Sequence, residues 1–186
     1  MKRLIDIFGS LIGLLLLGPV MLIVAMLIKL DSRGPVLYVS QRFGSGHALF
    51  GMRKFRTMRT DTPALPTHLL PDPQAHLTKL GRTLRKTSLD ELPQLWNVLK
   101  GDMSLVGPRP ALFNQDDLMV MREAAGVANL LPGITGWAQI NGRDEISLEV
   151  KVALEKEYLE RRSTILDVRI IALTVLKIFG RNSISH

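Results

Sequence analysis

Two adjacent carboxylates, Asp90 and Glu91, stand in the stretch TSLDELPQLWN of an otherwise basic chain. Neighbouring residues on a helix diverge by about 100°, so two adjacent carboxylates can serve different tasks. A carboxylate that attacks a phosphoryl group meets another anion, and nearby cations have to offset that repulsion. Lys54, Arg85 and Arg109 are candidates for these cations. Phosphoryl chemistry is therefore one interpretation of the pair.

Helix capping is a second interpretation of the same two acids. Ser88 is followed three residues later by Glu91, which is the spacing of a capping box, and acids are favourable at a helix N-terminus. Pro93 also suits the start of a helix. A helix N-terminus attracts anions through its free N–H groups as well. The residues alone therefore leave capping and a phosphate site both open.

Arg109 has the least ordinary setting among the candidate cations. Pro108 and Pro110 flank it and restrict the backbone on both sides. A guanidinium group held in this way can donate two parallel hydrogen bonds to a phosphate. Lys54 lies in the basic stretch MRKFRTMR, which contains no acid. Taken singly, either cation could be a solvated surface charge instead.

The composition limits the partners that such a site could have. The chain has 186 residues, enough for one domain with a real core, and 24 Lys and Arg against 17 Asp and Glu give a formal charge of +7. This balance favours nucleic acid, anionic lipid or phosphorylated small molecules. The chain has no cysteine, which excludes disulfides and a cysteine nucleophile. Because Trp, Tyr and Phe are scarce, we expect no nucleic acid among the partners.

An apolar run near the N-terminus indicates contact with a membrane. Residues 7–28 contain no charge, and a helix of that length would be roughly 33 Å long, enough to cross a bilayer core. Gly18-Pro19 near its middle predicts a sharp break. Basic residues flank the run on both sides, which draws both flanks towards the cytoplasm. A re-entrant helix satisfies both flanks, and a proline-kinked spanning helix remains the alternative.

The remaining pattern predicts a mainly α-helical fold with a small β-hairpin. Two short strands surround a Gly-Ser-Gly-His turn in residues 34–58, and a proline-rich loop follows. Residues 165–179 suit a helix that lies in the membrane interface, or else a buried core helix. The other expected elements are a helix over 89–99, an ordered turn over 101–112, a polar helix near 114–125, a loop over 131–143 and helix from 147 to 179.

Three stretches carry a family resemblance. KFRTM, LRKTSLDELPQLWNVLKGDMSLVGPRP and LPGITGWAQINGR follow one another behind the apolar N-terminus. In this order they resemble the monotopic phosphoglycosyl transferases, which are bacterial sugar transferases, and their small form that starts bacillosamine-linked protein glycosylation. The resemblance covers nearly the whole chain, and the ordered set is far more specific than any one motif.

The resemblance implies a concrete activity: transfer of a sugar-1-phosphate from a UDP-sugar to a polyprenyl (undecaprenyl) phosphate, with release of UMP. It implies Mg²⁺ and a covalent phosphosugar–aspartyl intermediate, with Asp90 as the nucleophile and Glu91 as the metal-binding partner. The same resemblance assigns the remaining site residues. Those expected to hold phosphate or shape the site are Lys54, Arg85 and Arg109, and those expected near the nucleotide or sugar are Gln139, Asn141 and Arg143.

The resemblance also implies a location and partners. Residues 1–30 would form a re-entrant membrane helix, and residues 31–186 a catalytic domain on the cytoplasmic face of the inner membrane. There the enzyme would contact lipids, form a homodimer if it associates, and begin a glycoconjugate such as O-antigen or exopolysaccharide. The chain departs from the family pattern at Leu148 and Glu155, where relatives often have an aromatic residue and Asp. A basic membrane-anchored nucleic-acid binder and an inactive scaffold are the alternatives.

Overall fold

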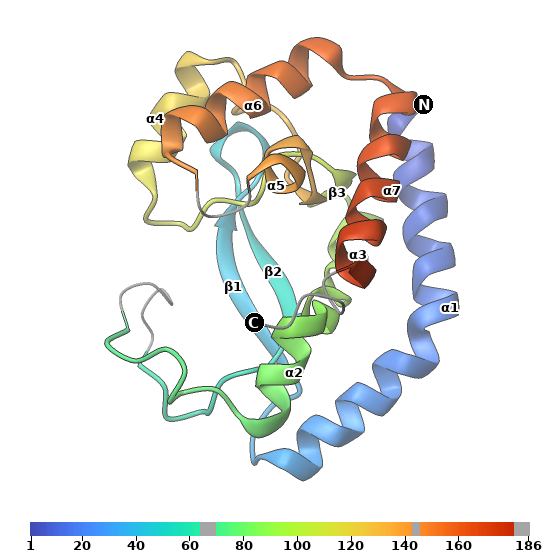
Figure 1. The fold of residues 1–186 in the computed structure, drawn as a ribbon, viewed down its shortest axis with the longest axis vertical. Helices are drawn as coiled ribbons and strands as arrows, with labels where there is room; N and C mark the ends of the chain where they lie inside the picture. Colours follow the sequence, from blue (N-terminus) through green and yellow to red (C-terminus); the bar gives the residue numbers. More distant parts are fainter. Residues whose placement is uncertain (64–69, 143–145, 181–186) are drawn as a thin grey trace.

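The computed structural model describes residues 1–63, 70–142 and 146–180; residues 178–180 are described by their backbone alone. Most of this part of the chain is helical, and one antiparallel β-hairpin stands beside the helices (Figure 1). The prediction of a mainly α fold with a small hairpin is therefore confirmed. The helices are α1 (Lys2–Asp31), α2 (Lys79–Thr87), α3 (Gln94–Lys100), α4 (Asp116–Ala124), α5 (Trp137–Asn141), α6 (Leu148–Arg161) and α7 (Thr164–Gly180).

Helix α1 is long and apolar enough to cross a membrane, and only 11% of its most apolar 18-residue window is buried against the rest of the protein. Its exposed face carries large apolar side chains such as Leu15, Leu16 and Leu22. The helix continues through Gly18-Pro19 without interruption, so the predicted sharp break is instead a bend along one helix, which Figure 1 shows. A re-entrant course through a bilayer stays a prediction.

Polar side chains at the start of α1 attach this helix to the domain. Asp6 is 2% exposed and accepts hydrogen bonds from the Ser104 hydroxyl and the Leu105 N–H, both at 2.9 Å. Lys2 donates to the Asp167 carboxylate of α7 at 2.7 Å. A buried carboxylate is tolerated only when its oxygens are hydrogen-bonded, and Asp6 meets that condition. These polar contacts lie in the first two turns of α1. Near its other end, Val24 and Ile28 pack against Phe55 and Leu84, and most of the apolar side chains between the two ends are exposed.

The hairpin consists of β1 (Leu37–Phe43) and β2 (Leu49–Phe55), joined through the short 3₁₀ turn η1 (Ser45–His47) at the predicted Gly-Ser-Gly-His sequence. In its register, Tyr38 faces Lys54 and Ser40 faces Met52. Residues directly opposite each other share a face of a sheet, and so do residues two apart on one strand. Arg42 is therefore on the same face as Lys54, at the other end of the hairpin.

A second, parallel pair of strands was not predicted. Strand β3 (Ser104–Val106) pairs with β4 (Gly133–Thr135), within stretches that the sequence indicated only as a turn and a loop. The two backbones come unusually close where β3 ends, because a Cβ atom on Gly133 would lie 2.1 Å from the Gly107 nitrogen. Glycine is required at this approach. The pairing fixes the segment that follows Gly107, which includes Arg109.

The helical pattern from 147 to 179 contains two helices, α6 and α7, separated at Arg162 and Ser163. One face of α7 is buried at Leu166 and Ile170, while Ile165 and Leu176 on its other face are exposed. The alternative of a fully buried core helix is therefore wrong. An exposed apolar face on a helix of this kind suits the membrane interface.

Candidate active site

Asp90 and Glu91 belong to a short 3₁₀ turn, η3 (Leu89–Glu91), between α2 and α3. Ser88 ends α2 in the left-handed region at φ 58°, and its side chain makes no capping hydrogen bond. The Glu91 carboxylate points to cations rather than back to the backbone of Ser88. The capping-box interpretation is therefore wrong, although both acids do lie in the first turn of η3. A helical segment does cover most of the expected range 89–99, as η3 and α3.

Glu91 is held by two cations. Its Oε1 accepts a hydrogen bond from Lys54 Nζ at 2.6 Å, and Arg109 Nη1 lies 3.8 Å from the same atom. Burial acts to raise the pKa of Glu91, but Lys54 and Arg109 outweigh it and the pKa is lowered. Glu91 is therefore ionised at neutral pH. The structure brings together three of the predicted site residues from β2, η3 and the Pro108–Pro110 segment.

Asp90 has a different environment from its neighbour. Its side chain belongs to a residue only 8% exposed, and it forms no ion pair with any residue that the structure describes. Burial raises the pKa of Asp90, although Lys54 and Arg85 act to lower it. A carboxylate without a direct counterion keeps its lone pairs available for attack. The environments of the two acids thus differ as expected for two different tasks.

Arg85 lies on α2 on the Asp90 side of the site. Its Nε donates a hydrogen bond to the buried hydroxyl of Thr57 at 3.0 Å, which fixes the guanidinium group. Burial lowers the pKa of Arg85, and Asp90 partly opposes that effect. Arg56, from the same basic stretch as Lys54, instead donates to the carbonyl oxygens of Ser32 and Arg33 and joins the end of α1 to the hairpin.

A shallow depression that is open to solvent lies over this cluster. Three cations and one carboxylate line it together with polar and apolar residues. One of the cations, Arg42, was missed by sequence reasoning. Its position on the hairpin face shared with Lys54 is the signal that could have identified it. The lining residues are Arg42, Met52, Lys54, Glu91, Gln94, Arg109, Pro110, Gly133 and Ile134.

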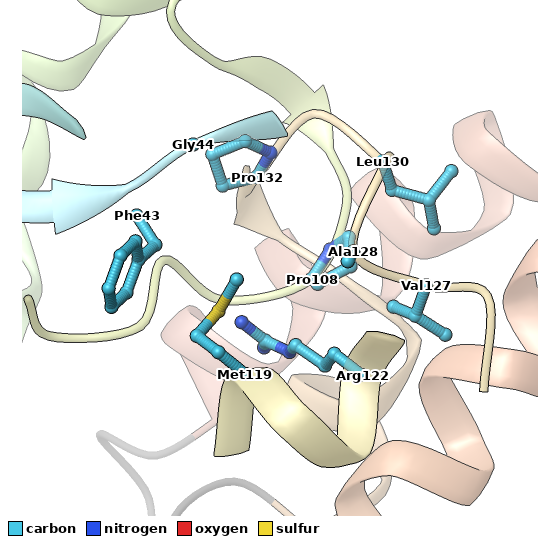
Figure 2. A pocket seen from close by; sticks show the side chains of 9 residues that line it. All are labelled: Phe43, Gly44, Pro108, Met119, Arg122, Val127, Ala128, Leu130 and Pro132. Atoms are coloured by element: carbon cyan, nitrogen blue, oxygen red, sulfur yellow. The ribbon is translucent and has the colours of Figure 1, made fainter. Parts of the chain in front are cut away.

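A second hollow lies behind the segment of Pro108, and Figure 2 shows Arg122 and Met119 extending beneath it from α4. Arg122 is the charged residue among those that line it. Its Nε donates to Glu155 at 2.8 Å, and its Nη2 donates to Glu155 at 2.5 Å and to the Arg109 carbonyl oxygen at 2.9 Å. Its charge is thus matched by a buried carboxylate, and the first depression is the better candidate for phosphate.

This ion pair explains the departure from the family pattern at Glu155. The residue is buried on α6 and reaches the candidate site only through Arg122, which holds the backbone of Arg109. Leu148, the other departure, packs against a core cluster with Met119 and Val152. Both residues stabilise the domain that carries the site.

The residues expected near the nucleotide or sugar lie on or after α5. The side-chain amide of Gln139 is buried, and neither its nitrogen nor its oxygen has a hydrogen-bond partner among the described residues. Asn141 donates locally to the Trp137 carbonyl oxygen at 2.8 Å, and Arg143 lies outside the described residues. Helix α5 is close to the Arg109 segment, since a Cβ atom on Gly136 would lie 2.1 Å from the Gly107 carbonyl oxygen. A buried amide without partners is costly unless water or a ligand satisfies it.

The two acids fit the needs of a magnesium ion that is held mainly by a substrate. In the described part of the chain, no group of three or more acidic or histidine side chains could cage an ion. Mg²⁺ usually takes one or two carboxylates, several waters and substrate phosphates. Glu91 uses Oε1 for Lys54, and its Oε2 accepts no hydrogen bond from the residues described. That oxygen and the Asp90 carboxylate are suitable hard ligands.

Comparisons with known proteins agree with this site. The family model for bacterial sugar transferases matches residues 1–181. The uncharacterized sugar transferase EpsL of Bacillus subtilis strain 168 is 44% identical over 186 residues, which cover all of this chain and 91% of EpsL. Undecaprenyl-phosphate glucose phosphotransferase of Komagataeibacter xylinus is 43% identical over 98% of this chain. UDP-glucose:undecaprenyl-phosphate glucose-1-phosphate transferase of Escherichia coli K12 is 40% identical over 96% of it.

The chain spans 36% and 40% of the length of the last two relatives. The resemblance to the bacillosamine type in particular stays a prediction. The match over residues 1–181 and the 44% identity to EpsL over its nearly complete length nevertheless agree with the ordered motifs around Asp90, Arg109 and Gln139. On these findings the chain belongs to the bacterial sugar transferase family.

Proposed function

We propose that this protein transfers a sugar-1-phosphate from a UDP-sugar to undecaprenyl phosphate and releases UMP. The names of the relatives from Komagataeibacter xylinus and Escherichia coli support undecaprenyl phosphate as the acceptor. The name of the Escherichia coli relative also supports a UDP-sugar as the donor. One observation carries the proposal. Asp90, a buried carboxylate that forms no ion pair with the described residues, adjoins a second carboxylate held between Lys54 and Arg109 at an open depression.

In this proposal Asp90 is the nucleophile. One of its oxygens forms a bond to the sugar-bearing phosphorus of the donor, and the bond from that phosphorus to the bridging oxygen breaks. The electron pair stays on the bridging oxygen, which leaves as part of UMP. An oxygen of the polyprenyl phosphate then attacks the same phosphorus and returns the Asp90 carboxylate. Lys54 and Arg109 offset the negative charge that gathers around the reacting groups.

Glu91 would hold Mg²⁺ together with the donor phosphates, and the ion would supply further positive charge there. Glu91 itself keeps Lys54 and Arg109 in place through its Oε1. Arg85 is positioned by Thr57 to balance the charge of Asp90. The unpartnered amide of Gln139 would serve the nucleotide or sugar.

The acceptor is a lipid, so the site has to be close to a bilayer. The exposed apolar faces of α1 and α7 support a membrane position for the protein. We propose that α1 enters and leaves the same leaflet at its bend, with the catalytic domain on the cytoplasmic face. The nucleic-acid-binding and scaffold alternatives gain no support from the comparisons.

A half-reaction tests the covalent step. Enzyme mixed with Mg²⁺ and each of a panel of UDP-sugars, without acceptor, should release up to one equivalent of UMP and gain the mass of one sugar phosphate on Asp90. Asp90→Asn should lose both signals, because an amide cannot form the acyl phosphate. Glu91→Gln is the matched control, since it should slow the step but leave the nucleophile. UMP release that strictly requires the acceptor, or an active Asp90→Asn enzyme, would overturn the covalent mechanism.

A further inference from the structure

Arg42 lies beside Arg109 because the backbone fixes the two segments together. The end of β1 pairs with the segment after Arg109 through a bridge between Arg42 and Leu112. Phe43 N–H also donates to the Ala111 carbonyl oxygen at 3.0 Å. The position of Arg42 thus follows from strand pairing, independently of any bond that its own side chain makes.

The Arg42 guanidinium group makes hydrogen bonds only to neutral oxygens in the described part of the chain. Its Nε donates to the Ser40 hydroxyl at 3.2 Å and its Nη1 to the Pro110 carbonyl oxygen at 3.3 Å. It forms no ion pair with any described residue. Burial and the charge of Arg109 lower the pKa of Arg42 to about 10, so the group remains charged at neutral pH. Glu91 opposes this effect only in part, so a further anion between the two guanidinium groups would be favourable.

The two acids of the site are influenced by different sets of charged groups. The charged groups that act on Asp90 are Lys54, Glu91 and Arg85. Those that act on Glu91 are Lys54, Arg109 and Arg42. Arg42 and Arg109 line the depression together with Lys54 and Glu91, whereas Arg85 is held by its hydrogen bond to Thr57. Each of the two acids thus has its own cations, an arrangement that suits two phosphates better than one.

We propose that Arg42, together with Arg109, binds the nucleotide phosphate of the donor, while Asp90 faces the sugar-bearing phosphate. This inference rests on the proposed function and adds the orientation of the donor to it. When the bond between the sugar-bearing phosphorus and the bridging oxygen breaks, the electron pair moves onto the nucleotide phosphate. Two guanidinium groups at that phosphate would stabilise the charge of the leaving UMP.

Binding of UMP, UDP and uridine to the purified protein in lipid nanodiscs tests this orientation. Arg42→Gln should weaken UMP and UDP binding on the order of 10- to 100-fold, as expected for loss of hydrogen bonds to a charged group. Uridine binding and the KM for polyprenyl phosphate should stay unchanged. Arg53→Gln is the matched control, because Arg53 lies on the opposite face of the same hairpin and its loss changes the net charge equally.

Three results would overturn the inference. In the first, Arg42→Gln and Arg53→Gln bind UMP equally well. In the second, Arg42→Gln weakens the binding of UMP and of uridine to the same extent. In the third, Arg42→Gln raises the KM for polyprenyl phosphate while UMP binding stays intact. If Arg42→Gln does not fold, Arg42→Lys decides the question, because lysine keeps the charge but lacks the planar guanidinium fork. Arg42→Lys should still weaken UMP binding more than uridine binding. A wild-type protein that neither binds UMP nor releases it from any UDP-sugar would defeat the proposed function itself.

Discussion

The buried pair of Arg122 and Glu155 offers a sharp test of how the site is held. Their side chains are 5% and 2% exposed, and Arg122 also donates to the Arg109 carbonyl oxygen. Glu155→Leu would leave Arg122 buried without its counterion, at a cost of about 3–5 kcal/mol. In a protein of this size each kcal/mol shifts Tm by about 2–4 °C, so Tm should fall on the order of 6–20 °C.

A double variant separates stability from positioning. Replacing both partners by leucine removes the uncompensated charge, and such exchanges are often neutral or stabilising. Arg122→Leu/Glu155→Leu should therefore recover most of the lost Tm. It still lacks the donor to the Arg109 carbonyl oxygen, which is the equivalent of one hydrogen bond. We therefore expect the KM for the UDP-sugar to rise, so that turnover at a donor concentration below KM stays about tenfold below wild type.

The assay compares thermal unfolding in nanodiscs, followed by tryptophan fluorescence, with UMP release at varied donor concentration. Glu160→Leu is the control, because Glu160 is exposed on the same helix and its substitution should change the free energy of unfolding by about 0.5 kcal/mol or less. A double variant with both wild-type Tm and wild-type turnover would refute the positioning role. A Glu155→Leu variant that melts like the control would refute the stabilising one.

Three further changes probe the acids, the arginine and the membrane helix. Asp90→Asn should melt no lower than wild type at pH 8, because burial raises the pKa of Asp90 and its ionisation in the folded protein therefore costs stability as the pH rises through that pKa. Any gain in Tm from the substitution should vanish at acidic pH, where Asp90 and Asn are both neutral, and a lower Tm for Asp90→Asn at pH 8 would contradict this. Arg109→Lys should reduce turnover on the order of 10- to 100-fold with Tm little changed, because the bidentate fork is lost, and wild-type turnover would make Arg109 a surface charge. A cysteine at position 2 should be labelled only from the cytoplasmic side, and periplasmic labelling of this variant would exclude the re-entrant course. Replacing Gly18-Pro19 by Leu-Leu in the same variant should make periplasmic labelling appear and lower activity.

The residues that meet at the candidate site could be predicted better than the framework that holds them. The ordered motifs placed Lys54, Glu91 and Arg109 in one site, and the structure confirms that these three side chains meet. Arg42 was not predicted as a site residue, because its position beside Arg109 depends on the register of the hairpin and on a bridge to Leu112. Residues 42 and 109 are far apart in the sequence, and no local pattern links them.

The parallel strands were missed for a related reason. Strands β3 and β4 have three residues each, too few to show the alternation that marks a strand. Their glycines and prolines are typical of turns, and the sequence pattern was interpreted in that way. Gly107 and Gly133 instead allow two backbones to touch, which is a tertiary requirement. The long helices, whose apolar pattern is local, were predicted more accurately than this short sheet.

The apolar helix α1 and the candidate phosphate site belong to one hydrogen-bonded unit, although they are far apart in the sequence. Asp6 of α1 fixes Ser104 and Leu105 of β3, and the chain continues from β3 directly into the segment of Arg109. Arg3 adds hydrogen bonds to the carbonyl oxygens that end α3. The depth of α1 in a bilayer would therefore determine the height of the site above the lipid. For the proposed polyprenyl phosphate acceptor, that height would have to match the level of the headgroup. The polar anchors at the start of the apolar helix would then set this height as well as stabilise the fold.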